Sequence, residues 1–102
     1  MPRYRARAMW YRLDLRVRAD VDDDALHEMG ILANTYAVVD EVMASRDPKS
    51  GESRIIARID APSAAAALGA LLTVISQTSG HAGLAEEGAL NRVAIERESP
   101  SR

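Results

Sequence analysis

The segment from residue 10 to residue 19 alternates strictly between apolar and polar side chains, and this pattern constrains the fold more than any other feature. Every second position from Tyr11 to Val17 is apolar, and the positions between them carry arginine or Asp14. A repeat of two residues is that of a β-strand with one buried face, because successive side chains of a strand point to opposite sides. The sequence therefore predicts a strand here, in a sheet whose one face is covered by other elements.

An acidic run at residues 20–24 follows this strand and precedes apolar residues at helical spacing, which include Leu26 and Met29. Carboxylates in the first turn of a helix accept hydrogen bonds from its free N–H groups and lie at the positive end of its dipole. We therefore predict a helix that begins in the acidic run and ends near Asn34 and Thr35.

Residues 36–44 permit two interpretations. Their Tyr and Val residues favour a strand, but Tyr36 and Met43 also continue the apolar side of the preceding helix. Residues 47–51, Asp-Pro-Lys-Ser-Gly, are typical of a hairpin turn, and residues 54–61 alternate again. Since a hairpin needs a strand on each side, we interpret residues 36–44 as a strand, and keep one long helix as the alternative.

A second helix is predicted from Pro62 to about Gly80, and residues 91–98 form a last strand with Val93 and Ile95 inward. The resulting order, β-α-β-β-α-β, resembles that of the ferredoxin-like superfold. The resemblance implies an α+β sandwich with a four-stranded antiparallel sheet and two helices on one face. It implies no activity, because unrelated functions occur on that fold. The alternative is a three-stranded β-α-β-α-β arrangement with one long first helix.

The length of 102 residues suits one domain with one core. We divide the chain into a basic arm at residues 1–8, an α+β domain at 9–98 and a frayed tail at 99–102. Cysteine is absent, which excludes disulfides and thiolate chemistry. No apolar run follows the basic N-terminus, and none is long enough to span a membrane. We therefore expect a cytoplasmic protein.

No motif reaches the level of a catalytic, metal or cofactor signature. The spacing of Asp20, Asp22 and Asp24 matches the start of a calcium loop, but Ala25 and Ile31 occupy the later positions that need Gly and a carboxylate. A helix N-cap explains these acids. His27-Glu28 begins a zinc-protease pattern, yet the second histidine of that pattern is missing, so His27 is interpreted as a surface residue. Loop residue His81 is a candidate general base beside Tyr11, Tyr36 or Glu86, but a solvated loop side chain is the simpler interpretation and the one that we favour. We expect no cofactor.

Arginines gather on one predicted face of the sheet. If the first and third strands are neighbours, as in the ferredoxin-like order, the side of the sheet away from the helices carries Arg12, Arg16, Arg18, Arg54 and Arg58. Arginine suits bidentate binding of carboxylate or phosphate, so this face is a candidate docking surface for an acidic partner or nucleic acid. The alternative is a ladder of cross-strand ion pairs with Asp14, Asp60, Glu96 and Glu98.

The second predicted helix is the other unusual surface, because residues 61–85 carry no formal charge with His81 neutral. Leucines and one isoleucine mark its buried side, at Leu68, Leu71, Leu72 and Ile75. Small uncharged residues on the far side would let another backbone approach closely. The candidate interface residues are Ala66, Ala70, Thr73 and Gln77. A merely Ala-rich exposed helix is the alternative.

The sequence thus predicts a small oligomeric interaction module without its own catalysis. It would self-associate, most simply as a dimer, or bind a protein partner through the second helix or the arginine face. The first alternative is a cofactor-free small-molecule-binding dimer or enzyme with a cleft near His81. The second is nucleic-acid binding through the arginine face and the arm with Arg3, Arg5 and Arg7, although the acidic body and the lack of stacking aromatics argue against it.

Overall fold

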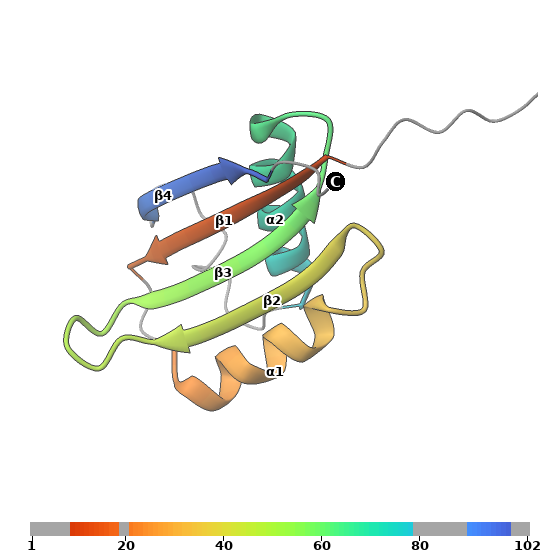
Figure 1. Cartoon of the computed structure of the whole chain (residues 1–102). Coiled ribbons are helices and arrows are strands. Elements are labelled where there is room, and N and C mark those ends of the chain that lie inside the picture. The colour runs from red at the N-terminus through yellow and green to blue at the C-terminus, as the bar shows by residue number, and fades with distance from the viewer. Residues whose placement is uncertain (1–8, 19–20, 79–89, 99–102) are drawn as a thin grey trace, which may run out of the picture.

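The computed structural model describes residues 9–18, 21–78 and 90–98 of the chain. Its elements are β1 (Trp10–Val17), α1 (Asp23–Ala33), β2 (Val39–Arg46), β3 (Ser53–Asp60), α2 (Ala64–Thr78) and β4 (Leu90–Arg97). This is the predicted order of strands and helices. The strands form one sheet in which every neighbouring pair is antiparallel (Figure 1). The α+β architecture, with a four-stranded antiparallel sheet and two helices, is therefore confirmed.

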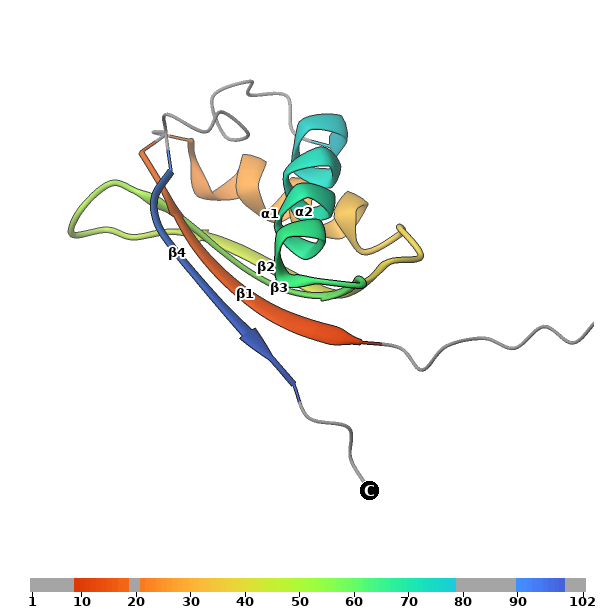
Figure 2. The same cartoon turned by 90° about the horizontal axis from the view of Figure 1, so that it is seen from above.

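The strand order across the sheet is β2-β3-β1-β4, so β1 and β3 are the central strands and β2 and β4 the edges. Figure 2 shows both helices on the same side of the sheet. The opposite side is covered by no described helix or strand. One side of the sheet thus faces the core, and the other presents its side chains outward.

The core lies between the helices and the central strands. On β1 and β3 the alternation seen in the sequence matches burial, because every second side chain is enclosed. The helices contribute their inward residues to the same cluster. The largest fully buried side chains are Leu13, Leu15, Leu26, Met29, Ile55, Ile59, Leu71 and Ile75. Burial of these aliphatic groups supplies the main driving force for folding, in a chain that has no phenylalanine.

Helix α1 begins at the predicted acidic run. Asp22 is its N-cap, and the Asp22 carboxylate accepts a hydrogen bond of 2.9 Å from the N–H of Ala25. The helix ends at the C-cap Asn34, and turns at residues 34–38 separate it from β2. The choice of a strand rather than one long helix is confirmed. The start of strand β2 was predicted too early. Tyr36 belongs to the turn before it, and the N–H of Tyr36 still donates to the carbonyl of Ala33.

The hairpin between β2 and β3 is confirmed at the predicted turn. The N–H of Asp47 donates to the carbonyl of Glu52, and the N–H of Gly51 donates to the carbonyl of Asp47. Gly51 has a φ of 75°, a conformation that costs a residue with a Cβ atom. Glycine therefore suits this position of the turn, because it adopts a positive φ without the strain of a Cβ atom.

Strand β4 corrects one expectation. Val93 and Ile95 pair with Leu15 and Leu13, so both lie on the helix side of the sheet as predicted. Val93 nevertheless remains 38% exposed, and Ile95 is half-buried. The described part of the helices covers the central strands more fully than this edge, so lying on the helix side does not by itself bury a side chain there.

Candidate interaction surfaces

The outward side of the sheet carries a cluster of charged side chains, and we call it the open face. The strand register places Arg12 opposite Arg58 and Arg16 opposite Arg54, which is the neighbourhood expected for the first and third strands. Arg18 lies beyond the end of β1, where it bonds to the side chain of Asn91. The open face comprises Trp10, Arg12, Asp14, Arg16, Glu41, Met43, Ser45, Arg54, Ile56, Arg58, Asp60, Arg92, Ala94 and Glu96.

Two of these arginines are held by carboxylates on neighbouring strands or turns. Arg54 binds Asp14 through two hydrogen bonds, with its Nε 3.1 Å from Oδ1 and its Nη2 2.7 Å from Oδ2. This bond from Arg54 lowers the pKa of Asp14 below its usual value, although partial burial acts in the opposite direction. Arg16 donates to Asp47 at 2.9 Å. One cross-strand pair of the predicted ladder, Arg54–Asp14, is therefore present in this half of the open face, whereas Arg16 pairs with the turn residue Asp47, which was not among the predicted acids.

Arg58 occupies a second network at the other end of the open face. It donates to Glu98 Oε1 from Nε at 3.0 Å and from Nη2 at 2.8 Å, and it also pairs with Asp40. Its guanidinium carbon lies 5.1 Å from the centre of the Trp10 ring, within the range of a cation–π contact. The hydrogen bonds that Arg58 donates to Glu98 raise the pKa of Arg58 above its usual value. The sequence analysis did not include Trp10 in this surface. The alternation along the strand places Trp10 on the same face as Arg12, but it does not show that the Trp10 ring lies against Arg58.

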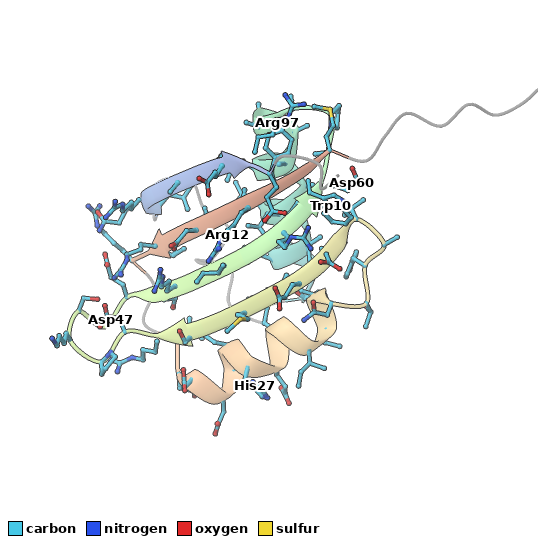
Figure 3. The ribbon with its side chains drawn as sticks, in the orientation of Figure 1. Trp10, Arg12, His27, Asp47, Asp60 and Arg97 are labelled. Atoms are coloured by element: carbon cyan, nitrogen blue, oxygen red, sulfur yellow. The ribbon has the colours of Figure 1, made fainter. Side chains whose placement is uncertain are left out.

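Arg12 and Arg92 differ from these arginines, since neither forms an ion pair with any described residue. Both are exposed on the open face, and Figure 3 shows Arg12 on the side of the sheet toward the viewer. Two shallow hollows adjoin them. One, of about 170 Å³, is lined by Asp14, Arg16, Arg54, Arg92 and Ala94. The other, of about 230 Å³, is lined by Arg12, Glu41, Met43, Ile56, Ala57, Arg58 and Glu98.

The open face is not purely charged. Met43 is 62% exposed and lies opposite Ile56, so the two form an apolar centre between the two networks. An exposed apolar centre with a charged surround is typical of a protein-docking surface rather than of a surface that only faces water.

The buried side of α2 differs from the predicted one. Its buried side consists of Ala67, Leu71, Val74 and Ile75, whereas Leu68 and Leu72 are only half-buried. The inward side is thus rotated relative to the predicted one. Of the candidate interface residues, Ala66 and Ala70 are half-buried against the core of the same chain, and Thr73 and Gln77 are exposed. These four residues form one strip along α2, and only its exposed half, Thr73 and Gln77, is fully available to a partner.

The space between α1 and β2 was not predicted. A groove of about 270 Å³ lies there, lined by His27, Gly30, Ile31, Asn34, Val42, Met43 and Ala44. His27 is exposed at its rim, in agreement with its interpretation as a surface residue. No group of three or more potential metal-ligating side chains occurs among the described residues.

The two edges of the sheet differ in how their backbone groups are used. Along β2, the Asn34 side chain accepts a bond of 3.0 Å from the N–H of Val42 and donates one of 3.2 Å to its carbonyl. Further along, Asp23 accepts a bond of 3.0 Å from the N–H of Arg46. Within residues 9–18, 21–78 and 90–98, no side chain bonds in this way to Val93 or Ile95 of β4. Helix α1 therefore covers one edge, and the described chain leaves the other open.

Several sequence-based candidates lie outside the described residues. These are His81 and Glu86, Asp20, and the basic arm with Arg3, Arg5 and Arg7. The cleft near His81 and the role of the arm thus stay predictions. Among the described residues, no helix is long and apolar enough to cross a membrane.

Comparison of the chain with protein-family models, with curated proteins and with solved structures finds no match.

Proposed function

We propose that the chain is a small, self-associating interaction module without catalysis of its own, and that its open face binds an acidic segment of a protein partner. The observation that carries this proposal is the state of Arg12 and Arg92. Both cations lie on the open face without an ion-pair partner among the described residues, next to arginines that carboxylates hold in place. A guanidinium group without an ion-pair partner can donate two parallel charge-assisted hydrogen bonds to an incoming carboxylate, and its planar geometry matches that of the carboxylate.

The composition of the open face favours a protein over nucleic acid. Asp14, Asp40 and Glu98 already neutralise Arg54 and Arg58, so the described residues of the open face form no continuous cationic track for a phosphate backbone. The Trp10 ring lies against Arg58 rather than standing free to stack on a base. Met43 and Ile56 instead offer an apolar contact beside Arg12, which suits a segment that carries both acidic and aliphatic side chains.

The open face is a better docking surface than helix α2. Ala66 and Ala70 already pack against the core of their own chain, which leaves Thr73 and Gln77 as the exposed half of that strip. An interface normally has an apolar centre, and this half of the strip consists of polar side chains.

The arrangement supports a ferredoxin-like topology as well. Read from the opposite edge, the strand order is β4-β1-β3-β2, with the first and third strands central and both helices on one side. A cytoplasmic location is part of the same proposal, and it rests on the sequence composition. The topology carries no activity with it.

Binding of an acidic peptide tests the proposal. Trp10 is the single tryptophan of the chain and lies on the open face, so its fluorescence reports events there. A synthetic peptide of alternating glutamate and leucine should change this fluorescence in a saturable manner. Arg12→Ala should weaken binding by up to about fivefold, because an exposed ion pair contributes at most about 1 kcal/mol. Added salt should weaken it further, because exposed charges are screened.

Arg97→Ala is the matched control. Arg97 pairs in register with the buried Tyr11, so it is an arginine of the same sheet on the opposite side. Its loss should leave peptide affinity unchanged. Equal losses for both variants, or stronger binding of a single-stranded oligonucleotide than of the peptide, would refute an acid-binding open face.

A further inference from the structure

Strand β4 presents a row of backbone hydrogen-bonding groups that the described chain does not use. It is an edge strand, paired on one side with β1. The N–H of Glu98 donates to the carbonyl of Trp10 at 2.9 Å, so the even-numbered residues of this strand direct their backbone toward β1. Val93, Ile95 and Arg97 therefore direct theirs outward. An exposed edge of this kind is a template for another strand.

The opposite edge shows that the fold can prevent such pairing. On β2, the outward groups of Val42 are bonded to Asn34 and the outward N–H of Arg46 to Asp23. Natural sheets cover or charge their edges to avoid association. In this chain, the side chains of Asn34 and Asp23 cover the edge at β2, and no described residue covers the edge at β4. This asymmetry indicates that β4 is the edge at which association occurs.

The side chains of β4 identify the occupant, because the strand is complementary to itself. In antiparallel pairing with a second β4 about a twofold axis at Ala94, Arg92 lies opposite Glu96 of the other copy, and Glu96 opposite its Arg92. On the other side of the sheet, Val93 lies opposite Ile95. Opposite charges and apolar side chains at facing positions both stabilise antiparallel pairs.

Other registers lack this match. A residue whose backbone N–H and C=O point outward must lie opposite another such residue. The twofold axis can therefore pass through a residue of the strand but not between two residues. An axis at Val93 places Arg92 opposite Ala94 and leaves Glu96 without a cation. An axis at Ile95 places Val93 opposite Arg97, and places Arg92 opposite Glu98, which Arg58 already binds. The axis at Ala94 is the one that uses both charges and both apolar residues.

We propose that β4 pairs antiparallel with β4 of a second copy of this chain about Ala94, which joins two sheets into one continuous sheet. The inference rests on the self-association in the proposed function and assigns its interface. The pairing buries the exposed Val93 against Ile95 of the other copy. It leaves Arg12 on the open face available to the acidic segment, whereas in the dimer Arg92 is paired with Glu96 of the other copy, in the row that begins with Arg54 and Arg16.

A single cysteine at position 94 tests this geometry. The chain has no cysteine, so Ala94→Cys introduces one reactive thiol. In the proposed register, residue 94 forms a non-hydrogen-bonded pair with itself, at a Cα–Cα separation of about 4.5 Å. That separation lies within the range of about 4.4–6.8 Å for disulfides. We expect mild oxidation to convert the folded variant to a disulfide-linked dimer.

Met43→Cys is the matched control, on the same face but on β2, with a strongly exposed side chain. At micromolar protein, Ala94→Cys should crosslink about a hundredfold faster than Met43→Cys, because a paired thiol has an effective concentration in the millimolar range. Equal crosslinking rates would overturn the proposed pairing.

Charge exchange provides a second test by sedimentation velocity. Arg92→Glu and Glu96→Arg each place like charges opposite one another twice, and each should weaken the dimer about tenfold. The double variant restores opposite charges and should recover an affinity close to that of the wild type. Failure of the double variant to recover, with both single variants weakened, would also overturn the register.

The tests separate this inference from the proposed function. If the wild-type chain sediments as a dimer but Ala94→Cys crosslinks no faster than its control, β4 pairing is wrong and self-association stands. If the wild type is a monomer at all concentrations, self-association and β4 pairing are both wrong. In either case, the fluorescence response to the acidic peptide measures binding at the open face independently of self-association.

Discussion

Replacing Asn34 with alanine removes the side chain that covers the middle of strand β2. Asn34 Nδ2 donates to the carbonyl of Gly30 at 2.8 Å and to that of Val42 at 3.2 Å, and Oδ1 accepts from the N–H of Val42 at 3.0 Å. One side chain thus caps α1 and also takes the place of a neighbouring strand. Its loss should lower stability and open the edge.

The magnitude follows from these three bonds. A typical intramolecular hydrogen bond contributes about 1 kcal/mol net, and somewhat less where water can replace it. Asn34 is exposed, so water can reach the groups that it leaves behind. We expect Asn34→Ala to lower the free energy of unfolding by about 1–2 kcal/mol. For a domain of this size, that corresponds to a fall in melting temperature of about 5–10 °C.

Urea unfolding followed by Trp10 fluorescence measures the free energy, and light scattering measures association. Thr35→Ala is the matched control, because the Thr35 hydroxyl donates to the carbonyl of Leu32 at 2.7 Å, within α1 and its end, rather than to β2. The control should lose about 0.5 kcal/mol and stay free of aggregates. The Asn34 variant should aggregate at high concentration through its uncovered edge. The same stability and scattering for both variants would refute the role assigned to Asn34.

Further predictions concern the turn, a helix and the ion pairs. Gly51→Ala should lower the free energy of unfolding by about 1 kcal/mol, because a residue with a Cβ atom is strained at φ of 75°. Gly69→Ala, in exposed α2 where an added Cβ meets no atom within 4 Å, should instead raise it by about 0.5–1 kcal/mol; urea unfolding of both variants tests for opposite signs. The lowered pKa of Asp14 means that the stability it contributes is present above its unfolded pKa and is lost as pH falls through its folded pKa. Asp14→Asn should therefore be less stable than the wild type at neutral pH, and the two urea midpoints should converge well below pH 3.8.

The elements of the fold were largely predictable because their signals are local. Alternation gives β1 and β3 directly, and a Gly-containing turn between two apolar runs gives the hairpin. The start of β2 was less certain, since Tyr36 and Val39 suit a strand equally well. The C-cap bonds that hold residues 34–36 at the end of α1 decide it, and these depend on the three-dimensional turn.

The buried side of α2 was predicted with the wrong rotation for a related reason. Alanine, leucine and valine occur all around this helix, and no charged residue marks the outward side. Periodicity alone then leaves several rotations with similar apolar content. The structure buries Ala67 and Val74 together with Leu71 and Ile75, and leaves Leu68 and Leu72 half-buried.

The open face was predicted as a set of arginines, but their individual states were not. Strand order and register gave the neighbours of Arg12 and Arg54. Which guanidinium groups bind a carboxylate depends on side chains distant in sequence, such as Asp47 for Arg16 and Glu98 for Arg58. The contrast between the two edges likewise depends on bonds from α1 to β2 that no local pattern encodes.

Amide hydrogen exchange at Val93 and Ile95, followed by NMR as a function of protein concentration, tests the central claim most directly. Both N–H groups point outward from β4, away from β1. If this strand pairs with a second copy, their exchange should slow progressively as concentration rises through the dissociation constant of the dimer, in step with the sedimentation data. Rapid exchange of both amides at every concentration, or protection that does not depend on concentration, would contradict β4 as the site of self-association.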